Sequence, residues 1–219
     1  MNTIRAVIFD LDGTLLNTLD DLAGAVNHAL ALHGYPVRSL EEIRRFVGNG
    51  IANLIHRALP DGVDADTEAA VLADFRAYYA VHNMDVTAPY DGVREMLAAL
   101  RDAGIPMALV SNKIESAVEA LRCHFFADSI AVAIGDDPSR PRKPAPDGTY
   151  AALARLGVSA DEAIFVGDSD VDVDTARNAG MRMLAVTWGF RDADTLRARG
   201  ATLLADTPAD ATRILLGKE

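Results

Sequence analysis

Short apolar runs of strand length alternate with stretches of helical periodicity from Pro89 onward. This alternation favours a parallel sheet covered by helices on both faces and joined by right-handed crossovers. We therefore predict an α/β fold with a doubly wound, mostly parallel, Rossmann-like sheet. The predicted strands of this part lie at 106–110, 130–134, 163–166, 183–187 and 203–204, and the predicted helices at 93–104, 114–125, 146–156, 175–179 and 208–216.

The first strand of the sheet is predicted close to the amino terminus. Residues 4–9 form a short run rich in β-branched and aromatic side chains, which favours a buried strand. The chain then has helical periodicity and no convincing strand between Leu15 and Met84, with predicted helices at 19–30, 39–48, 51–59 and 66–82. This block reads as an insertion. We expect a core of residues 1–14 and 88–219 and a small helical cap of residues 15–87.

Composition limits the classes of partner. The 219 residues include 32 acidic and 21 basic side chains, and a net charge of −11 disfavours nucleic acid and anionic membranes. Cys123 is the single cysteine, so no intrachain disulfide is possible; its apolar flanks predict a core position. The run at 4–9 is too short for a signal or membrane helix, and we expect a cytoplasmic protein. Nothing in the sequence predicts the oligomeric state.

Two carboxylates follow the first predicted strand, in the segment Asp10-Leu11-Asp12-Gly13-Thr14. Ligands bind at the carboxyl ends of strands in open α/β sheets. Alternation along an extended chain sends Asp10 and Asp12 to the same side, where both can reach one phosphoryl group or one hard cation. Gly13 supplies the permissive backbone for a sharp exit from the strand. An ordinary acidic turn has the same composition, so this segment alone does not decide between the two.

Polar residues also follow the other predicted strands. These are Ser111 and Asn112, Lys143 in a later loop, and Asp168 followed by Asp170, Asp172 and Asp174. A parallel sheet gathers such strand ends into one crevice. Several carboxylates that lie close together repel one another and can all stay ionised only if a cation binds them. Because their oxygens are hard ligands, the cation they favour is Mg²⁺. Mg²⁺, a lysine and a hydroxyl can offset the charge of a phosphoryl group in transfer. One carboxylate can then be the nucleophile while the other exchanges protons.

Taken singly, each of these residues has a structural interpretation. Ser111-Asn112 could begin a helix, and Lys143 before a proline could be a solvated loop residue. A calcium loop over 168–179 is disfavoured because an EF-hand requires glycine at its sixth position, where Val173 stands. The joint occurrence of these residues, in order and at strand ends, is the specific signal.

Four segments together resemble a known family. Asp10-Leu11-Asp12-Gly13-Thr14, Ser111, Lys143-Pro144 and the segment 167–172 are similar to the four motifs of the haloacid dehalogenase-like superfamily of phosphohydrolases. The resemblance covers essentially the whole chain, because the helical insertion resembles the small helical cap of that superfamily. It implies a phosphatase that works through an aspartyl-phosphate intermediate.

The resemblance also implies a role for each matched residue. Asp10 would be the nucleophile, Asp12 the general acid/base, and Ser111 and Lys143 the groups that orient the phosphate. Mg²⁺ would be held by Asp10, the backbone carbonyl of Asp12 and Asp168, with Asp172 assisting directly or through water. An acid at Asp12 disfavours halide displacement. Asp170 and Asp174 lie off the matched positions, and we expect them to be solvated.

Within the superfamily, three further segments look most like phosphoglycolate phosphatases: residues 46–50, 111–113 and 186–189. This likeness implies a small anionic substrate, with 2-phosphoglycolate favoured. Arg45, or Arg44 beside it, could meet the carboxylate of that substrate, although a solvated helix face is the alternative for both. The residues expected to bind substrate are Gly13, Thr14, Asn112, Arg45 and Gly48.

Other functions stay open at this point. A β-phosphoglucomutase-like mutase would share the cap and the motifs, and a phosphatase for pyrophosphate, nucleotides or sugar phosphates would differ mainly in the cap. A phospho-receiver domain, which is phosphorylated on Asp but barely turns over, fits less well. No Asp closes the predicted strand 130–134, and receivers lack both the helical insertion and the acidic cluster at Asp168.

Overall fold

The computed structural model describes residues 4–48 and 50–218. Asn49, within the segment 46–50 singled out above, lies outside them. The chain forms two compact units, one extending to Leu16 and resuming at Pro89, the other spanning Asn17–Ala88.

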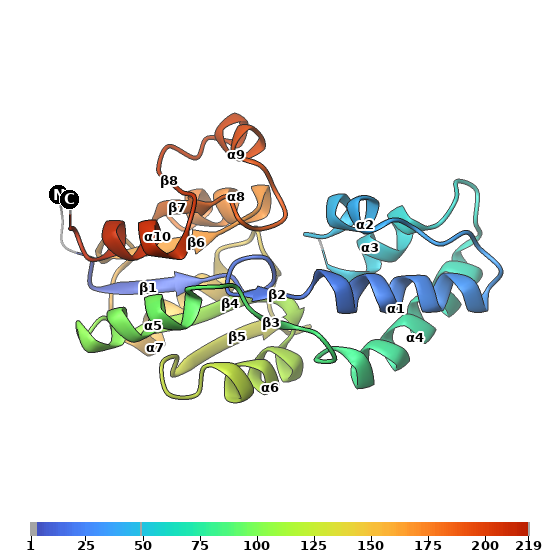
Figure 1. Cartoon of the computed structure of the whole chain (residues 1–219), viewed down its shortest axis with the longest axis horizontal. Coiled ribbons are helices and arrows are strands. Elements are labelled where there is room, and N and C mark those ends of the chain that lie inside the picture. The colour runs from blue at the N-terminus through green and yellow to red at the C-terminus, as the bar shows by residue number, and fades with distance from the viewer. Residues whose placement is uncertain (1–3, 49, 219) are drawn as a thin grey trace. The chain divides into compact units, whose positions relative to one another are not determined.

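Figure 1 shows the helices and strands of the first unit, which holds the sheet. Their bounds are β1 Ala6–Phe9, α5 Val93–Asp102, β4 Met107–Ile114, α6 Glu115–Phe125, β5 Val132–Asp136, α7 Asp147–Leu156, β6 Ala163–Gly167, α8 Asp170–Asn178, β7 Arg182–Val186, α9 Ala193–Arg199, β8 Leu204–Ala205 and α10 Pro208–Leu215. A single 3₁₀ turn, Ala160–Glu162, precedes β6.

The sheet is parallel and doubly wound, as predicted. Within the described residues it has six strands in the order β5-β4-β1-β6-β7-β8, and each paired register is parallel. The chain winds outward in one direction from β1 to β5 and in the other from β6 to β8. In such sheets the crevice at this reversal, at the carboxyl ends of the two central strands, is the usual ligand site. The fold therefore predicts a ligand site at the carboxyl ends of β1 and β6.

Side chains that alternate along each strand form two apolar layers. In β1, Val7 and Phe9 pack with α5, α6 and α10, whereas Ala6 and Ile8 pack with α7 and α8 on the other face. All four side chains are fully buried, as expected of a central parallel strand covered on both sides. Burial on both faces holds the end of β1 rigidly, which is where Asp10 lies.

Strands β4 and β5 extend further than the sequence indicated. Strand β4 continues past Ser111 to Ile114, with a register shift against β5 after Val110, so the Ser-Asn-Lys segment lies within the strand. Strand β5 continues to Asp136, so an Asp does close that strand, contrary to one reason given above against a receiver domain. Tertiary pairing between these neighbouring strands outweighs their polar composition.

The largest difference concerns α8, which begins at Asp170 and not at Thr175. Ser169 caps this helix, and its side chain and that of Asp172 exchange hydrogen bonds with each other's backbone N–H groups. This is a capping box with Asp in the place of the usual Glu or Gln. A stretch expected to be a loop is therefore the first turn of a helix, and Asp172 has a fixed position there.

The second unit is helical, with α1 (Leu19–Leu32), α2 (Leu40–Phe46), α3 (Ile51–Ala58) and α4 (Ala65–His82). Apolar side chains from all four helices form its own core, including Val26, Ile43, Ile55 and Phe75. Ser39 and Glu42 form a capping box at the start of α2. Thr18 stands at the N-cap of α1 but makes no side-chain capping bond. None of the described helices is long and apolar enough to cross a membrane.

Short pairings mark where the chain enters and leaves this insertion. β2 (Leu16–Asn17) and β3 (Ala88–Pro89) form a two-stranded sheet that the sequence did not indicate. Asp21, buried in α1, accepts hydrogen bonds from the backbone N–H and the hydroxyl of Thr87 at 2.9 and 2.7 Å. Hydrogen bonds to a buried charged group are among the stronger ones in proteins, so Asp21 ties the start of the insertion to its end.

Candidate active site

Three buried carboxylates converge at the reversal of the sheet. One oxygen from each of Asp10, Asp168 and Asp172 lies within 4.8 Å of the others. Asp10 directly follows β1, and its backbone N–H extends the pairing with β6 by donating to the Val166 carbonyl at 2.9 Å. Asp168 directly follows β6, and Asp172 lies in the first turn of α8. The structure therefore brings together three of the four residues that the sequence assigned to a metal site.

The side chain of Asp12, the fourth expected residue, lies apart from this group. Lys113 donates from its Nζ to Asp12 Oδ1 at 2.8 Å, and the two side chains are 8% and 16% exposed. The sequence reasoning gave Asp12 a backbone role at the metal and a separate side-chain role as acid/base. The geometry is compatible with both roles. The role at the metal uses only the backbone carbonyl, and the side chain, which bonds to Lys113, lies outside the carboxylate cluster.

Lys143 lies against the carboxylate cluster. Its Nζ donates to Asp10 Oδ1 and to Asp172 Oδ1, both at 2.7 Å, and its side chain is 5% exposed. Asn112 donates from Nδ2 to the backbone carbonyl of Lys143 at 3.0 Å and so fixes the loop that carries it. The Ser111 hydroxyl, also buried, accepts from the backbone N–H of Lys113 at 3.1 Å. Ser111 and Asn112 thus order this side of the site.

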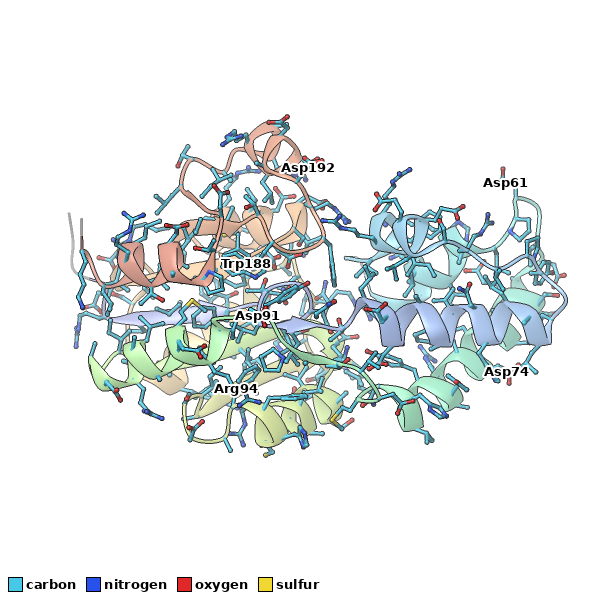
Figure 2. The ribbon with its side chains drawn as sticks, viewed as in Figure 1. Asp61, Asp74, Asp91, Arg94, Trp188 and Asp192 are labelled. Carbon is cyan, nitrogen blue, oxygen red and sulfur yellow. The ribbon has the colours of Figure 1, made fainter. Side chains whose placement is uncertain are left out.

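Asp168 is held by hydrogen bonds on both carboxylate oxygens. The Thr14 hydroxyl donates to Oδ1 at 2.9 Å, and the backbone N–H of Phe190 donates to Oδ2 at 2.7 Å. The indole N–H of Trp188, labelled in Figure 2, donates to the Thr14 carbonyl at 3.0 Å. Thr14 is fully buried and its hydroxyl bonds to Asp168, while the substrate contact expected of it stays a prediction.

Three glycines leave room for the carboxylates. A Cβ on Gly13 would lie 2.3 Å from Asp168 Oδ2, one on Gly189 would lie 2.4 Å from Asp168 Cβ, and one on Gly167 would lie 2.5 Å from Asp172 Cβ. Cβ atoms are essentially never found so close to other heavy atoms. Gly13, which the sequence assigned to substrate, therefore also provides the space for Asp168. Gly189 does the same from the far side.

Burial and mutual repulsion oppose ionisation of the cluster. Burial raises the pKa of Asp168 to about 7, and the negative charge of Asp172 adds to the shift. Burial and then Asp172 also raise the pKa of Asp10 well above its ordinary value, although Lys143 opposes this. Burial by itself would lower the pKa of Lys143, but Asp10 and Asp172 together outweigh it and raise that pKa. A further positive charge would favour full ionisation of the carboxylates.

The charges of the buried side chains indicate which kind of ion would supply this additional positive charge. One ammonium group faces the three carboxylates of the cluster: Lys143 against Asp10, Asp168 and Asp172. The excess, when all are ionised, is two negative charges, which one divalent cation would neutralise. The donors are all oxygens, as hard cations prefer. The residues present therefore fit a divalent metal ion.

The cap residues expected to bind substrate lie in the second unit. Arg45 is 70% exposed and pairs with Glu41 through Nε at 3.2 Å, and Arg44 also lies near Glu41, at 3.9 Å. Gly48 is half-buried in the turn after α2. A pairing between residues one helical turn apart is typical of a solvated helix face, which was the alternative interpretation for both arginines.

Two expectations from the sequence were wrong, that Asp174 is solvated and that Cys123 lies in the core. Asp174 is not solvated, because it is 14% exposed and forms ion pairs with Arg177 and Arg199. Asp170 pairs with Arg191 at 3.2 Å and remains 35% exposed. Cys123 is not in the core. It is exposed, since its position on α6 faces away from the buried Leu121.

The sequence reasoning assigned no role to several residues that the structure places here: Lys113, Trp188, Gly189 and Phe190. A partial signal was present, because residues 111–113 and 186–189 were two of the segments that resembled phosphoglycolate phosphatases. Periodicity and strand ends could not indicate that residues 187–190 support Asp168, since that support depends on contacts between distant parts of the chain.

A family comparison agrees with this geometry. Residues 7–186 match the family model described as haloacid dehalogenase-like hydrolase. The chain belongs to that family. It is 38% identical over 208 residues to the phosphoglycolate phosphatase of Pseudomonas putida, with 92% of this chain and 76% of the relative covered. It is 36% identical to the phosphoglycolate phosphatase of Chromobacterium violaceum, with 94% of both chains covered.

Solved structures agree with the sequence relatives. A crystal structure of a candidate phosphoglycolate phosphatase from Lactobacillus delbrueckii subsp. bulgaricus superposes with a TM-score of 0.95 at 34% identity, covering 99% of this chain and 100% of that one. The predicted fold, family and enzyme class are thereby confirmed: the chain is a phosphatase of the haloacid dehalogenase-like hydrolases.

Gly189→Ala tests whether the fit around Asp168 is required for metal binding. The added Cβ would lie 2.3 Å from the backbone carbonyl oxygen of Gly13 and 2.4 Å from Asp168 Cβ, so Asp168 must move. We expect the affinity for Mg²⁺, measured by calorimetric titration, to fall by about 10- to 100-fold, as is common when the support of a ligand is disturbed. Gly24→Ala in α1 is the control, because a Cβ there meets nothing within 4 Å. Wild-type affinity in Gly189→Ala would contradict this role.

A divalent metal should stabilise the protein more as the pH rises. With its folded-state pKa at about 7 against an ordinary 3.8, Asp168 holds a proton in the folded protein that the unfolded chain has released. Metal-free stability should therefore fall as the pH rises through this window. Metal binds the ionised form, so the increase in Tm on adding Mg²⁺ should be small near about pH 5 and large near about pH 8. At about 100 times Kd the stabilisation is about 2.7 kcal/mol.

Thermal unfolding with Mg²⁺ or with chelator, across this pH range, measures the effect. Asp168→Asn is the matched variant, since it removes one ligand and one of the two carboxyl groups with a raised pKa, Asp10 being the other. It should weaken the pH dependence and abolish the shift in Tm. A shift that is equal at both pH values, or that survives in Asp168→Asn, would disagree with this explanation.

Proposed function

We propose that this chain is a Mg²⁺-dependent phosphomonoesterase that hydrolyses 2-phosphoglycolate through an aspartyl phosphate on Asp10. The observation that carries the proposal is the arrangement of two carboxylates two residues apart. Asp10 lies in the buried cluster with Lys143, whereas Asp12 lies outside it with Lys113. This separation supports Asp10 as the nucleophile and Asp12 as the acid/base.

The first step transfers the phosphoryl group to the enzyme. A carboxylate oxygen of Asp10 attacks phosphorus, the ester P–O bond breaks, and the leaving alkoxide takes a proton from Asp12. Lys143, which pairs with Asp10 and Asp172, supplies positive charge beside the attacking oxygen. Mg²⁺ held by Asp10, Asp168, Asp172 and the Asp12 backbone carbonyl would, when bound, offset the negative charge of the phosphoryl group.

The second step regenerates the enzyme. A water molecule attacks the phosphorus of the aspartyl phosphate and gives up a proton to Asp12, now a carboxylate. The bond between phosphorus and Asp10 breaks, inorganic phosphate leaves, and both side chains return to their starting forms. The same carboxylate therefore acts first as acid and then as base, as microscopic reversibility allows.

The substrate is proposed from two kinds of support. The named relatives from Pseudomonas putida and Chromobacterium violaceum are phosphoglycolate phosphatases. A chain with a net charge of −11 can bind a small anion only where positive charge is available, and the buried Lys143 together with a bound divalent cation would supply it beside Asp10. Arg45 remains the proposed contact of the substrate carboxylate, and Gly48 remains a proposed substrate-binding residue. The expected cytoplasmic location remains part of this proposal.

Phosphate release from a substrate panel tests the proposal. The panel holds 2-phosphoglycolate, β-glucose 1-phosphate, a nucleoside monophosphate and pyrophosphate, each with Mg²⁺ or with chelator. We expect Mg²⁺-dependent release that favours 2-phosphoglycolate. Asp10→Asn should lower kcat by at least about a thousandfold, as loss of a nucleophile does in other enzymes. Asp20→Asn, a matched change at an exposed position of α1, should leave activity unchanged.

Each other outcome rejects a different part of the proposal. Equal release across the panel would reject the substrate and keep the chemistry. Conversion of β-glucose 1-phosphate to glucose 6-phosphate without release would indicate a mutase. Full activity in a folded Asp10→Asn protein would reject Asp10 as the nucleophile.

A further inference from the structure

Lys113 lies in the part of β4 that continues beyond Ser111. Its backbone N–H donates to the Ser111 hydroxyl at 3.1 Å, and the register of β4 against β5 shifts between Val110 and Ile114. From this position its Nζ reaches Asp12 Oδ1 at 2.8 Å. The contact joins residues from the ends of the neighbouring strands β1 and β4.

The use of lysine in this chain is unusually restricted. The sequence has three lysines and 18 arginines. Two of the lysines, Lys113 and Lys143, have side chains only 8% and 5% exposed and each contacts an active-site carboxylate, whereas Lys218 is exposed near the carboxyl terminus. An ammonium group is a compact point charge, whereas a guanidinium is a wide planar fork. Both buried positions therefore hold the more compact of the two cations, Lys113 beside one carboxylate and Lys143 between two.

The two lysines contact different carboxylates. Lys143 bonds to Asp10 and Asp172, which belong to the cluster, and Lys113 bonds to Asp12, which does not. Lys113 engages Oδ1 of Asp12, and within residues 4–48 and 50–218 the structure gives Oδ2 no hydrogen bond. One oxygen of Asp12 is held while the other is available to carry a proton.

We propose that Lys113 is the positioning residue of Asp12 and fixes the side-chain rotamer in which Oδ2 meets the leaving-group oxygen. The proposal rests on the function proposed above. A free aspartate side chain samples several staggered rotamers, and misplacing a catalytic group by about 1 Å can cost about 100-fold in rate. Holding Oδ1 removes that freedom without using the oxygen that transfers the proton.

This role makes a prediction about leaving groups. Protonation by Asp12 matters for a basic leaving group such as phenolate and much less for the weakly basic 4-nitrophenolate. Lys113→Met should therefore slow transfer from phenyl phosphate by about 100-fold, and transfer from 4-nitrophenyl phosphate by less than about 10-fold. KM should change little for either substrate, because Lys113 is not proposed to bind the phosphate.

Rapid-quench single turnovers with Mg²⁺ measure this step directly. The variants are Lys113→Met, Lys113→Arg, Asp12→Asn and the double variant, with Lys218→Met as the matched control at an exposed lysine. Asp12→Asn should show the same dependence on the leaving group, and adding Lys113→Met to it should change the rate by less than about twofold. Lys113→Arg, which keeps the charge, should recover part of the loss, and Lys218→Met should match the wild type.

Two results would overturn the proposal. Equal slowing with both substrates, or a further large loss when Lys113→Met is added to Asp12→Asn, would mean that Lys113 acts on the phosphate or on the fold. If Lys113→Met does not fold, Lys113→Arg and Lys113→Gln carry the same comparison. A wild-type protein inactive on every phosphomonoester would instead reject the proposed function, so the two failures are distinguishable.

Discussion

Mutual repulsion among three buried carboxylates is the constraint on which this structure depends. Asp10, Asp168 and Asp172 lie close together in a place where water cannot screen them, so each must be held in position against its neighbours. The central strands β1 and β6, buried on both faces, provide the rigid base. Lys143 supplies opposing charge, and Asp168 is held by the Thr14 hydroxyl, the Phe190 N–H group and the close approach of Gly13 and Gly189. What the carboxylates still lack is positive charge, and a divalent cation has the charge and ligand preference to provide it.

The separation of Asp10 from Asp12 connects this constraint to chemistry. If the chain continued as an extended strand after β1, Asp10 and Asp12 would point to the same side and share one environment. Instead Asp10 points into the cluster, and Asp12 points to Lys113 on the next strand. Environment, and not residue type, then decides which group attacks phosphorus and which transfers a proton. The net charge of −11 makes such local positive charge necessary for an anionic substrate.

Much of the fold could be predicted because periodicity and strand ends are local signals. The parallel sheet, the helical insertion and the convergence of Asp10 with Asp168 all follow from apolar runs and the polar residues after them. The start of α8 was missed because a run of aspartates resembles a loop, although Ser169 caps a helix there. The contacts of Lys113 and Gly189 could not be predicted, since they depend on the register of β4 and on a loop far away in sequence.

The covalent step at Asp10 is the central claim, and chemical trapping tests it most directly. Enzyme mixed with substrate and Mg²⁺ would be quenched in acid during turnover and treated with borohydride, which reduces an acyl phosphate to an alcohol. Peptide mass spectrometry should then find homoserine at position 10, and none in enzyme treated without substrate or in Asp10→Asn. Homoserine at position 12 or 168, or none in an enzyme that turns over, would contradict the assignment of Asp10 as the nucleophile.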